Sequence, residues 1–581
     1  MRHSPVDRVR AAYRRIAEVD RPEVWITLRG EPDVLVAAKE IERRIDGGER
    51  LPLAGLLVAV KDNIDVAGLP TTAACPSYAY SPPASATAVH RLTEAGALVL
   101  GKTNLDQFAT GLVGTRSPYG AVRHAHRPDR ISGGSSSGSA VAVALGIVDF
   151  ALGTDTAGSG RVPAALHGLV GFKPTLGLVP NTGVVPAARP YDCVTVFAGT
   201  LTLAQRAIAV MAGPDPLDPT SRDWPASVRL AAGTRPRVAV PDAAGLAPLS
   251  DEARAAFRSV VERLRAGGVA IEVIDVDPFL RAAKLLYEGA LVAERYAAVG
   301  EFLERASAGA TGSAGATGSA GPAGDLDPTV TAIILAARQL PAHRLAADLE
   351  RLDRHRLTAA AALAGFDALL LPTTTGHPTI AEVAADPVAV NSRMGTYTNF
   401  VNLLDLAAVA VPGGTADGSP FGVTLVSRAF DDQVAIDIAA RLTGEQAEEP
   451  LPATGTDLVV FGAHLRGQPL NGQLTALGAR FAGPVRTAPE YRMVALPTEP
   501  PKPGILRAAS GGAALAGERW TLSPAGLGRF LAALPAPMSL GRISMADGDS
   551  ALGFQCDPVA AAGGEEITQY GSWTAYLASL G

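Results

Sequence analysis

The sequence is poor in cysteine and has no long hydrophobic run. Its three cysteines, Cys75, Cys193 and Cys556, lie far apart and lack the spacing of a disulfide framework or a zinc site, which is typical of proteins from a reducing compartment. No stretch reaches about 18 uninterrupted apolar residues, so we expect no membrane-spanning helix. Residues 1–20 are basic but contain no apolar core of a signal peptide. We therefore expect a cytoplasmic protein.

An excess of positive charge is also missing. The formal net charge is -6, and lysine and arginine are scattered along the chain, so we expect neither nucleic acid nor a membrane surface as a partner. His124 and His126 are close in sequence, but a third ligand at suitable spacing is absent. We expect no metal and no cofactor.

Short apolar runs alternate with helix-like stretches, which predicts an α/β fold with a mixed central sheet covered by helices on both faces. The predicted strands are Leu56–Val60, Ala97–Leu100, Ile147–Leu152, Asp367–Leu371, Ala407–Val411 and Gly422–Val426. Helices are predicted in residues 5–45, 250–305 and 328–364.

The length of 581 residues predicts more than one domain. We place a large domain at 1–445, a charged, proline-containing linker at 446–456 and a small α+β domain at 457–581. A Gly/Ala/Ser/Thr repeat at 307–324 cannot bury enough apolar surface to offset the entropy of ordering, so we expect a mobile loop there.

Three segments carry the residues of a serine hydrolase without a histidine base. Lys61 follows an apolar run, and Ser135 and Ser159 each lie in a Gly/Ser-rich loop. A serine hydroxyl needs a base within hydrogen-bond reach. A lysine amine can be that base when burial lowers its pKa. The pattern therefore predicts a proton relay from Ser159 through Ser135 to Lys61.

Small residues surround both serines. Gly133, Gly134 and Gly138 allow backbone bends that other residues cannot adopt. Before Ser159, the backbone N–H groups of Thr156, Ala157 and Gly158 are predicted to converge on a developing oxyanion.

A second motif is misleading. Residues 96–103 read GALVLGKT, a formal match to the phosphate-binding loop. Its interior is itself strand-like and a helical stretch, 88–95, precedes it, so we do not predict a phosphate site.

These segments resemble the amidase signature family of serine amidohydrolases, whose triad is serine, cis-serine and lysine. The resemblance implies the amidase signature fold for residues 1–445 and assigns the triad to Ser159, Ser135 and Lys61. It covers the three segments in order and with the family's spacing.

Two further features resemble the allophanate hydrolases, a subgroup of that family. Tyr287 and Arg295 are eight residues apart, which places both on one face of a helix, where a guanidinium and a phenol can hold a small carboxylate. The tail after residue 457 resembles the cyclotransferase-like domain of these enzymes. The resemblance implies allophanate as substrate, Tyr287 and Arg295 as its carboxylate-binding pair, and His464 as a group that promotes decarboxylation of the first product.

Other interpretations stay open. His464 is either catalytic or structural, and the last domain either reactive or an assembly module. The chain is alternatively the glutamine-hydrolysing subunit of an amidotransferase, another amidase, or a silent assembly component. The sequence has no Met-Lys-Met biotin-attachment motif, so we expect a separate urea carboxylase as supplier, unless allophanate comes from cyanurate breakdown. We also expect a homodimer.

Overall fold

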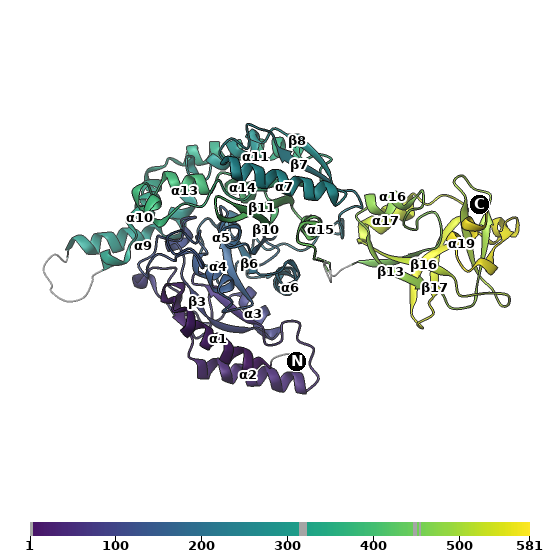
Figure 1. Ribbon diagram of the computed structural model, residues 1–581, viewed down its shortest axis with the longest axis horizontal. Helices are drawn as coiled ribbons and strands as arrows, with labels where there is room; N and C mark the ends of the chain where they lie inside the picture. Colours follow the sequence, from purple (N-terminus) through teal and green to yellow (C-terminus); the bar gives the residue numbers. More distant parts are fainter. Residues whose placement is uncertain (1–3, 313–321, 446–449, 453–454, 581) are drawn as a thin grey trace. The chain divides into compact units, whose positions relative to one another are not determined.

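The computed structural model describes residues 4–312, 322–445, 450–452 and 455–580. They form two compact units (Figure 1). The first comprises residues 1–223 and 236–449, and the second comprises residues 224–235 and 450–581.

The first unit is built on a mixed sheet of 11 strands within the described residues. In spatial order the strands are β1 (Trp25–Leu28), β3 (Leu98–Thr103), β2 (Leu57–Lys61), β4 (Phe150–Asp155), β6 (Cys193–Ala198), β5 (Val170–Lys173), β10 (Leu406–Ala416), β11 (Ser419–Arg428), β9 (Ala368–Pro372), β7 (Arg237–Pro241) and β8 (Ala270–Ile274). Strand β2 pairs in parallel with β3 and β4, whereas β4 pairs antiparallel with β6.

Helices flank this sheet (Figure 1). They are α1 (Pro5–Val19), α2 (Glu31–Asp46), α3 (Thr87–Glu94), α4 (Ser137–Ala144), α5 (Val162–His167), α6 (Leu201–Met211), α7 (Asp251–Ala266), α8 (Asp277–Lys284), α9 (Ala293–Gly312), α10 (Pro328–Ala336), α11 (Ala342–Ala362), α12 (Ile380–Ala385), α13 (Ala389–Met394), α14 (Asn399–Leu403) and α15 (Asp432–Thr443).

The predicted fold class is confirmed, and a strand lies at each predicted position. Every residue of β2, β3 and β4 is buried, as expected for strands covered on both faces. Lys102, the lysine of the motif at 96–103 that formally matches a phosphate-binding loop, lies within β3 and forms an ion pair with Asp62 at 3.0 Å. The backbone there is a strand and not a phosphate-binding loop.

The helix predictions were too long. Strand β1 separates α1 from α2 inside residues 5–45, and β8 interrupts the second predicted helical region after α7. Gly268 has φ +80 just beyond α7, a conformation that ends a helix and favours glycine. The repeat predicted as a loop begins inside α9, which continues to Gly312. Residues 313–321 lie outside the described part of the chain, as do 446–449 and 453–454 of the predicted linker.

The second unit contains two sheets and four helices in its described residues. The larger sheet runs β13 (Arg480–Arg486), β16 (Ala516–Leu522), β12 (Thr456–Val460), β18 (Ser550–Cys556) and β17 (Met538–Ser544). The smaller sheet runs β15 (Lys502–Arg507), β14 (Tyr491–Leu496) and β19 (Glu565–Glu566). The helices are α16 (Asn471–Ala476), α17 (Pro524–Ala532), α18 (Pro558–Ala562) and α19 (Trp573–Ser579).

Residues 224–235 pack with the second unit, although the sequence analysis assigned them to the first domain. The Leu230 N–H donates to the Gly478 carbonyl at 2.9 Å, and the Ala525 N–H donates to the Ala226 carbonyl at 2.9 Å. Leu230 is 1% exposed. The segment has no regular periodicity of its own, so its residues offer no signal of this long-range packing.

Candidate active site

Lys61 lies at the carboxyl end of β2 and is fully buried. Its Nζ is 2.8 Å from Ser135 Oγ and 2.7 Å from Thr154 Oγ1. Ser135 Oγ is in turn 3.0 Å from Ser159 Oγ. The structure therefore brings together the three residues predicted from sequence, in the order lysine, Ser135, Ser159.

The loop around Ser135 depends on glycine because other groups approach closely. The Gly134–Ser135 peptide bond is cis. A Cβ on Gly134 would lie 2.0 Å from the Asp106 carboxylate. Gly133 adopts φ +73, which disfavours any residue with a side chain. Glycine at both positions lets Ser135 reach the end of β2.

The turn that carries Ser159 is held by a buried ion pair. Asp155, the last residue of β4, accepts from Arg161 Nε and Nη2, both at 2.9 Å, and both side chains are fully buried. Burial alone would raise the pKa of Asp155, but Arg161 holds it below its usual value. The pair fixes the residues on either side of Ser159.

Thr154 belongs to the site, although the sequence analysis did not identify it. Its hydroxyl is within hydrogen-bond distance of Lys61, and its carbonyl is 3.5 Å from the same amine. Asn63 also donates to this hydroxyl, at 3.3 Å. Thr154 lies on β4, the strand that pairs with β2, which carries Lys61. In the sequence, only its place near the end of a predicted strand could have indicated that it belongs to the site.

The pKa of Lys61 is lowered to about 7. Burial is the largest cause, because a dry environment disfavours the ammonium form. The carboxylates of Asp106, Asp155 and Asp192 oppose this shift, whereas the cationic Arg295 adds to it. No carboxylate of a described residue forms a salt bridge with Lys61, and with a pKa of about 7 roughly half of the amine is neutral at pH 7.

The predicted oxyanion donors differ in their availability. The Gly158 N–H already donates to Asp155 Oδ1 at 2.8 Å. In this conformation Asp155 uses that donor to shape the turn, and a role for Gly158 in stabilising the oxyanion stays a prediction. The Ala157 carbonyl accepts from Thr398 at 2.6 Å and the Thr156 hydroxyl donates to Asp192 at 2.5 Å. These two bonds do not involve the N–H groups of Thr156 and Ala157, which remain the candidate oxyanion donors.

Tyr287 and Arg295 meet, but not on one continuous helix. Helix α8 ends at Lys284 and α9 begins at Ala293, so Tyr287 lies in the intervening turns. Arg295 Nη2 donates to the Tyr287 hydroxyl at 2.8 Å. The guanidinium carbon also lies 5.0 Å from the tyrosine ring centre. The helix prediction was wrong because Gly289 interrupts the run, yet the turn brings the two side chains together.

Arg295 is a buried cation without an acidic partner. It is 1% exposed, and among the described residues it forms no ion pair. Its hydrogen-bond partners are neutral: Tyr287, the Thr110 hydroxyl at 2.9 Å and the Ala109 carbonyl at 3.5 Å. Its Nε has no hydrogen-bond partner in the described part of the chain. A buried charge of this kind is costly unless an anion joins it.

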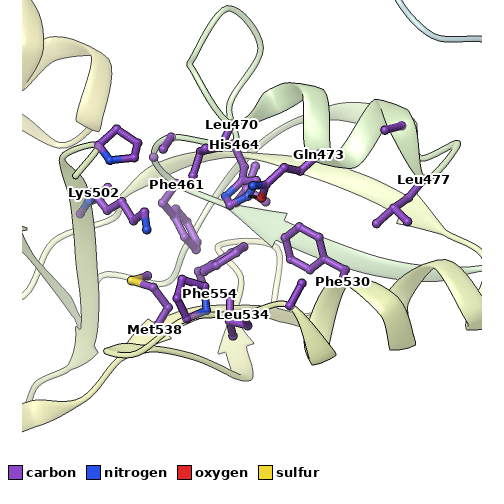
Figure 2. Close-up of a pocket in the computed structure, with 18 of the residues that line it drawn as sticks. Phe461, His464, Leu470, Gln473, Leu477, Lys502, Phe530, Leu534, Met538 and Phe554 are labelled. Atoms are coloured by element: carbon purple, nitrogen blue, oxygen red, sulfur yellow. Dashed lines mark hydrogen bonds between the residues drawn. The ribbon is translucent and has the colours of Figure 1, made fainter. Parts of the chain in front are cut away.

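His464 lines a cavity of about 490 Å³ in the second unit. Figure 2 shows its ring between the side chains of Gln473, Phe530 and Phe554. His464 Nε2 is 2.9 Å from Gln473 Oε1, and the ring stacks on Phe554 with centroids 5.1 Å apart. Burial, together with the nearby Lys502, lowers the pKa of His464 below 6.5. The imidazole is therefore neutral at physiological pH.

His124 and His126 belong to a cluster of imidazoles. The His124 ring stacks on His167 at 4.2 Å and lies 4.9 Å from His377. Backbone groups occupy both nitrogens of His124 and of His167. Over residues 4–312, 322–445, 450–452 and 455–580, no group of three or more His, Cys, Asp or Glu side chains is placed to hold a metal ion.

In the same residues, no helix is long and apolar enough to cross a bilayer.

Comparison with known proteins places both units. The amidase family model matches residues 7–435, and the model of the allophanate hydrolase C-terminal domain matches residues 456–578. The urea amidolyase of Saccharomyces cerevisiae is 40% identical over 97% of this chain, which spans 32% of that protein's length.

Two further relatives match different shares of the chain. The structure of Kluyveromyces lactis allophanate hydrolase has 37% identity and a TM-score of 0.87, and the match covers 100% of this chain and 98% of that one. One subunit of the glutamyl-tRNA(Gln) amidotransferase of Symbiobacterium thermophilum is 35% identical over 75% of this chain and 92% of its own. The chain thus belongs to the amidase family and carries an allophanate hydrolase C-terminal domain after its amidase unit.

Proposed function

We propose that the chain is an allophanate hydrolase, which cleaves the terminal amide of allophanate (urea-1-carboxylate) by a Ser-cisSer-Lys mechanism. The observation that carries this proposal is the buried guanidinium of Arg295, which lacks an acidic partner among the described residues and lies close enough to Lys61 to influence its pKa. Allophanate carries the carboxylate that such a cation requires and the amide that the serine relay attacks.

The relay supplies the proton transfers. A neutral Lys61 amine has two N–H groups and one lone pair. When it donates to the hydroxyl and carbonyl of Thr154, the lone pair faces Ser135, 2.8 Å away. Ser135 passes its proton to Lys61 as it takes the proton of Ser159, whose oxygen attacks the amide carbon.

The rest of the cycle follows from the same contacts. The backbone N–H groups of Thr156 and Ala157 stabilise the oxyanion. Ammonia leaves with a proton returned through Ser135, and water then releases the acyl group from Ser159. The product of this step is ammonia that carries two carboxylates.

The amidotransferase alternative has less support. The amidotransferase relative matches three quarters of this chain, whereas the allophanate hydrolase structure matches all of it. Glutamine also carries a carboxylate, so Arg295 by itself does not distinguish the two substrates. Assaying ammonia release from allophanate and from glutamine in parallel distinguishes the two.

Two variants test the main proposal. Ser159→Ala is expected to abolish ammonia release from allophanate without loss of folding, and retained turnover would exclude Ser159 as the nucleophile. Arg295→Ala is expected to raise KM for allophanate steeply, by roughly a hundredfold, because it removes a charge-assisted contact. Any activity toward neutral amides should be spared, and an unchanged KM for allophanate would remove the carboxylate-binding role.

We also propose that His464 promotes loss of carbon dioxide from the first product, which leaves carbamate. Two features support this role: the neutral imidazole lines an accessible cavity, and Lys502 lines the same cavity and offers a positive charge to a carboxylate. Carbamate then breaks down, so that each allophanate gives two ammonia and two carbon dioxide. The competing interpretation is a packing role for His464 in an assembly domain.

The test for His464 counts the two products separately. In His464→Ala, we expect the first ammonia at the normal rate while carbon dioxide evolution lags behind it. Gln473→Leu is the matched control, because it removes the partner of His464 but keeps the ring. Equal rates of both products in His464→Ala would favour the packing role.

The supply of substrate and the assembly are proposals as well. We propose that a urea carboxylase forms the allophanate, with cyanurate breakdown as the other source, and that the chain works as a homodimer in the cytoplasm. Mass measurement of the purified protein in solution tests the dimer.

A further inference from the structure

A short segment, Gln107–Gly111, lies between the cation and the nucleophile. The Thr110 hydroxyl accepts from Arg295 Nη1 at 2.9 Å. The carbonyl of the next residue, Gly111, is 3.5 Å from Ser159 Oγ. Thr110 and Gly111, adjacent in one buried segment, therefore contact Arg295 and Ser159, respectively. The distance between the guanidinium and the nucleophile is the distance that a substrate has to match between its carboxylate and its amide carbon.

The backbone of this segment is held in an unusual conformation. Phe108 and Ala109 have φ +50 and +52, in the left-handed region that residues with side chains rarely adopt. The Phe108 N–H donates to the Ala73 carbonyl at 3.0 Å, and Gln107 Nε2 donates to the Ala74 carbonyl at 2.8 Å. Conformations of this cost persist where the surroundings determine them, and they cluster at functional sites.

The surroundings of Phe108 add rigidity. Its ring is 2% exposed and packs edge-on against Tyr78, with centroids 5.4 Å apart. Phe302 of α9 contacts the same ring at 6.0 Å. Because α9 also carries Arg295, the segment and the helix that holds the cation are packed together.

The orientation of the Thr110 hydroxyl follows from its two contacts. It donates to the Phe108 carbonyl at 3.1 Å, so its hydrogen is used within the segment. A lone pair is therefore presented to Arg295 Nη1. With Tyr287 on Nη2, the guanidinium is anchored at two nitrogens, and the buried Nε, which has no partner in the described residues, is left for a ligand.

We propose that Thr110 is a positioning residue for substrate selection, whose hydroxyl fixes the Arg295 guanidinium relative to Ser159 so that amides bearing a carboxylate are preferred. This inference rests on the proposed function and deepens it. Without the hydroxyl, a buried N–H of Arg295 loses its acceptor, and the guanidinium turns to find another. The segment then no longer sets the distance between the cation and the reacting carbon.

Thr110→Val tests this inference, because valine keeps the shape of threonine and removes only the hydroxyl. We expect KM for allophanate to rise roughly ten- to a hundredfold, as for loss of a hydrogen bond to a charged group, with a much smaller change in kcat. The affinity for malonate, used as a dicarboxylate probe by calorimetry, should fall by the same factor. Labelling of Ser159 by a fluorophosphonate should be unchanged. Thr110→Ser, which keeps the hydroxyl, should remain close to the wild type.

A double variant separates positioning from packing. If Thr110 acts through Arg295, Thr110→Val adds nothing in an Arg295→Ala background, whereas independent effects would add. Thr110→Ala is a second deletion of the hydroxyl, to be used if the valine variant does not fold.

The outcomes distinguish this inference from the proposed function. Wild-type turnover of allophanate with an unchanged KM and malonate affinity in Thr110→Val would overturn the role of Thr110 alone. A wild type that turns over no allophanate would overturn the proposed function. Additive effects in the double variant would also overturn the inference.

Discussion

At the residue scale, the catalytic candidates were predictable and their supporting residues were not. Lys61, Ser135 and Ser159 lie in local patterns that the sequence displays directly. Thr154 and Thr110 carry no such pattern, because their contacts with Lys61 and Arg295 depend on how distant strands and turns are placed. At Gly158 the local pattern indicates an oxyanion donor, but it does not indicate that the N–H also donates to the neighbouring Asp155 carboxylate.

The lowered pKa of Lys61 gives a prediction for pH dependence. A general base acts in its deprotonated form, so kcat/KM is expected to be low below pH 7, to rise as pH passes about 7 and to level off above it. Lys61→Arg, which stays charged at all accessible pH values, should lose roughly a hundredfold to ten-thousandfold in kcat. A pH profile with no step between 6 and 8 would contradict a buried amine base.

At the scale of elements, strands were easier to predict than helices. Strands such as β2 and β4 begin with apolar runs and are buried at every residue, because both faces are covered. The sequence between α8 and α9 predicts a continuous helix, but the structure has turns there. The backbone becomes extended at Gly289, and packing with the rest of the unit determines this break. The break is useful, because it lets Tyr287 fold back onto Arg295.

The histidine cluster beside α5 predicts acid sensitivity of the first unit. Burial lowers the pKa of His124 and of His377 to about 4, whereas the unfolded chain takes up these protons near pH 6.5. Between pH 4 and pH 6.5 the unfolded state binds more protons than the folded state. The histidine contribution to the free energy of unfolding is therefore fully present above pH 6.5 and declines as pH falls toward 4.

Urea unfolding at several pH values measures this effect. His377→Gln should flatten the decline between pH 6.5 and 4.5 relative to wild type. His343→Gln, at an exposed histidine, is the control and should leave the slope unchanged. Equal slopes in all three proteins would rule out the cluster as the source.

At the scale of the whole molecule, the sequence indicated two domains but not the path of the chain between them. The predicted boundary near 455 followed from a charged, proline-containing stretch. Residues 224–235 lack any such mark and yet pack with the second unit.

Leu230→Ala tests that packing. Loss of this buried side chain should lower the free energy of unfolding of the second unit by about 2–5 kcal/mol. Three of the four tryptophans, Trp224, Trp520 and Trp573, belong to this unit, so fluorescence follows it selectively. Leu531→Ala, at a side chain 53% exposed, is the control. Unaltered fluorescence midpoints in Leu230→Ala would contradict the packing of this segment.

The split path also bears on synthesis and on engineering. Chains emerge from the ribosome N-terminal end first. Residues 224–235 are therefore synthesised before residues 236–449, and they can pack with the rest of the second unit only after residues 450–581 have followed. A gene fragment cut at the predicted linker would encode the second unit without residues 224–235, which pack with it. Transplanting the tail between enzymes therefore requires moving the distant twelve-residue stretch along with it.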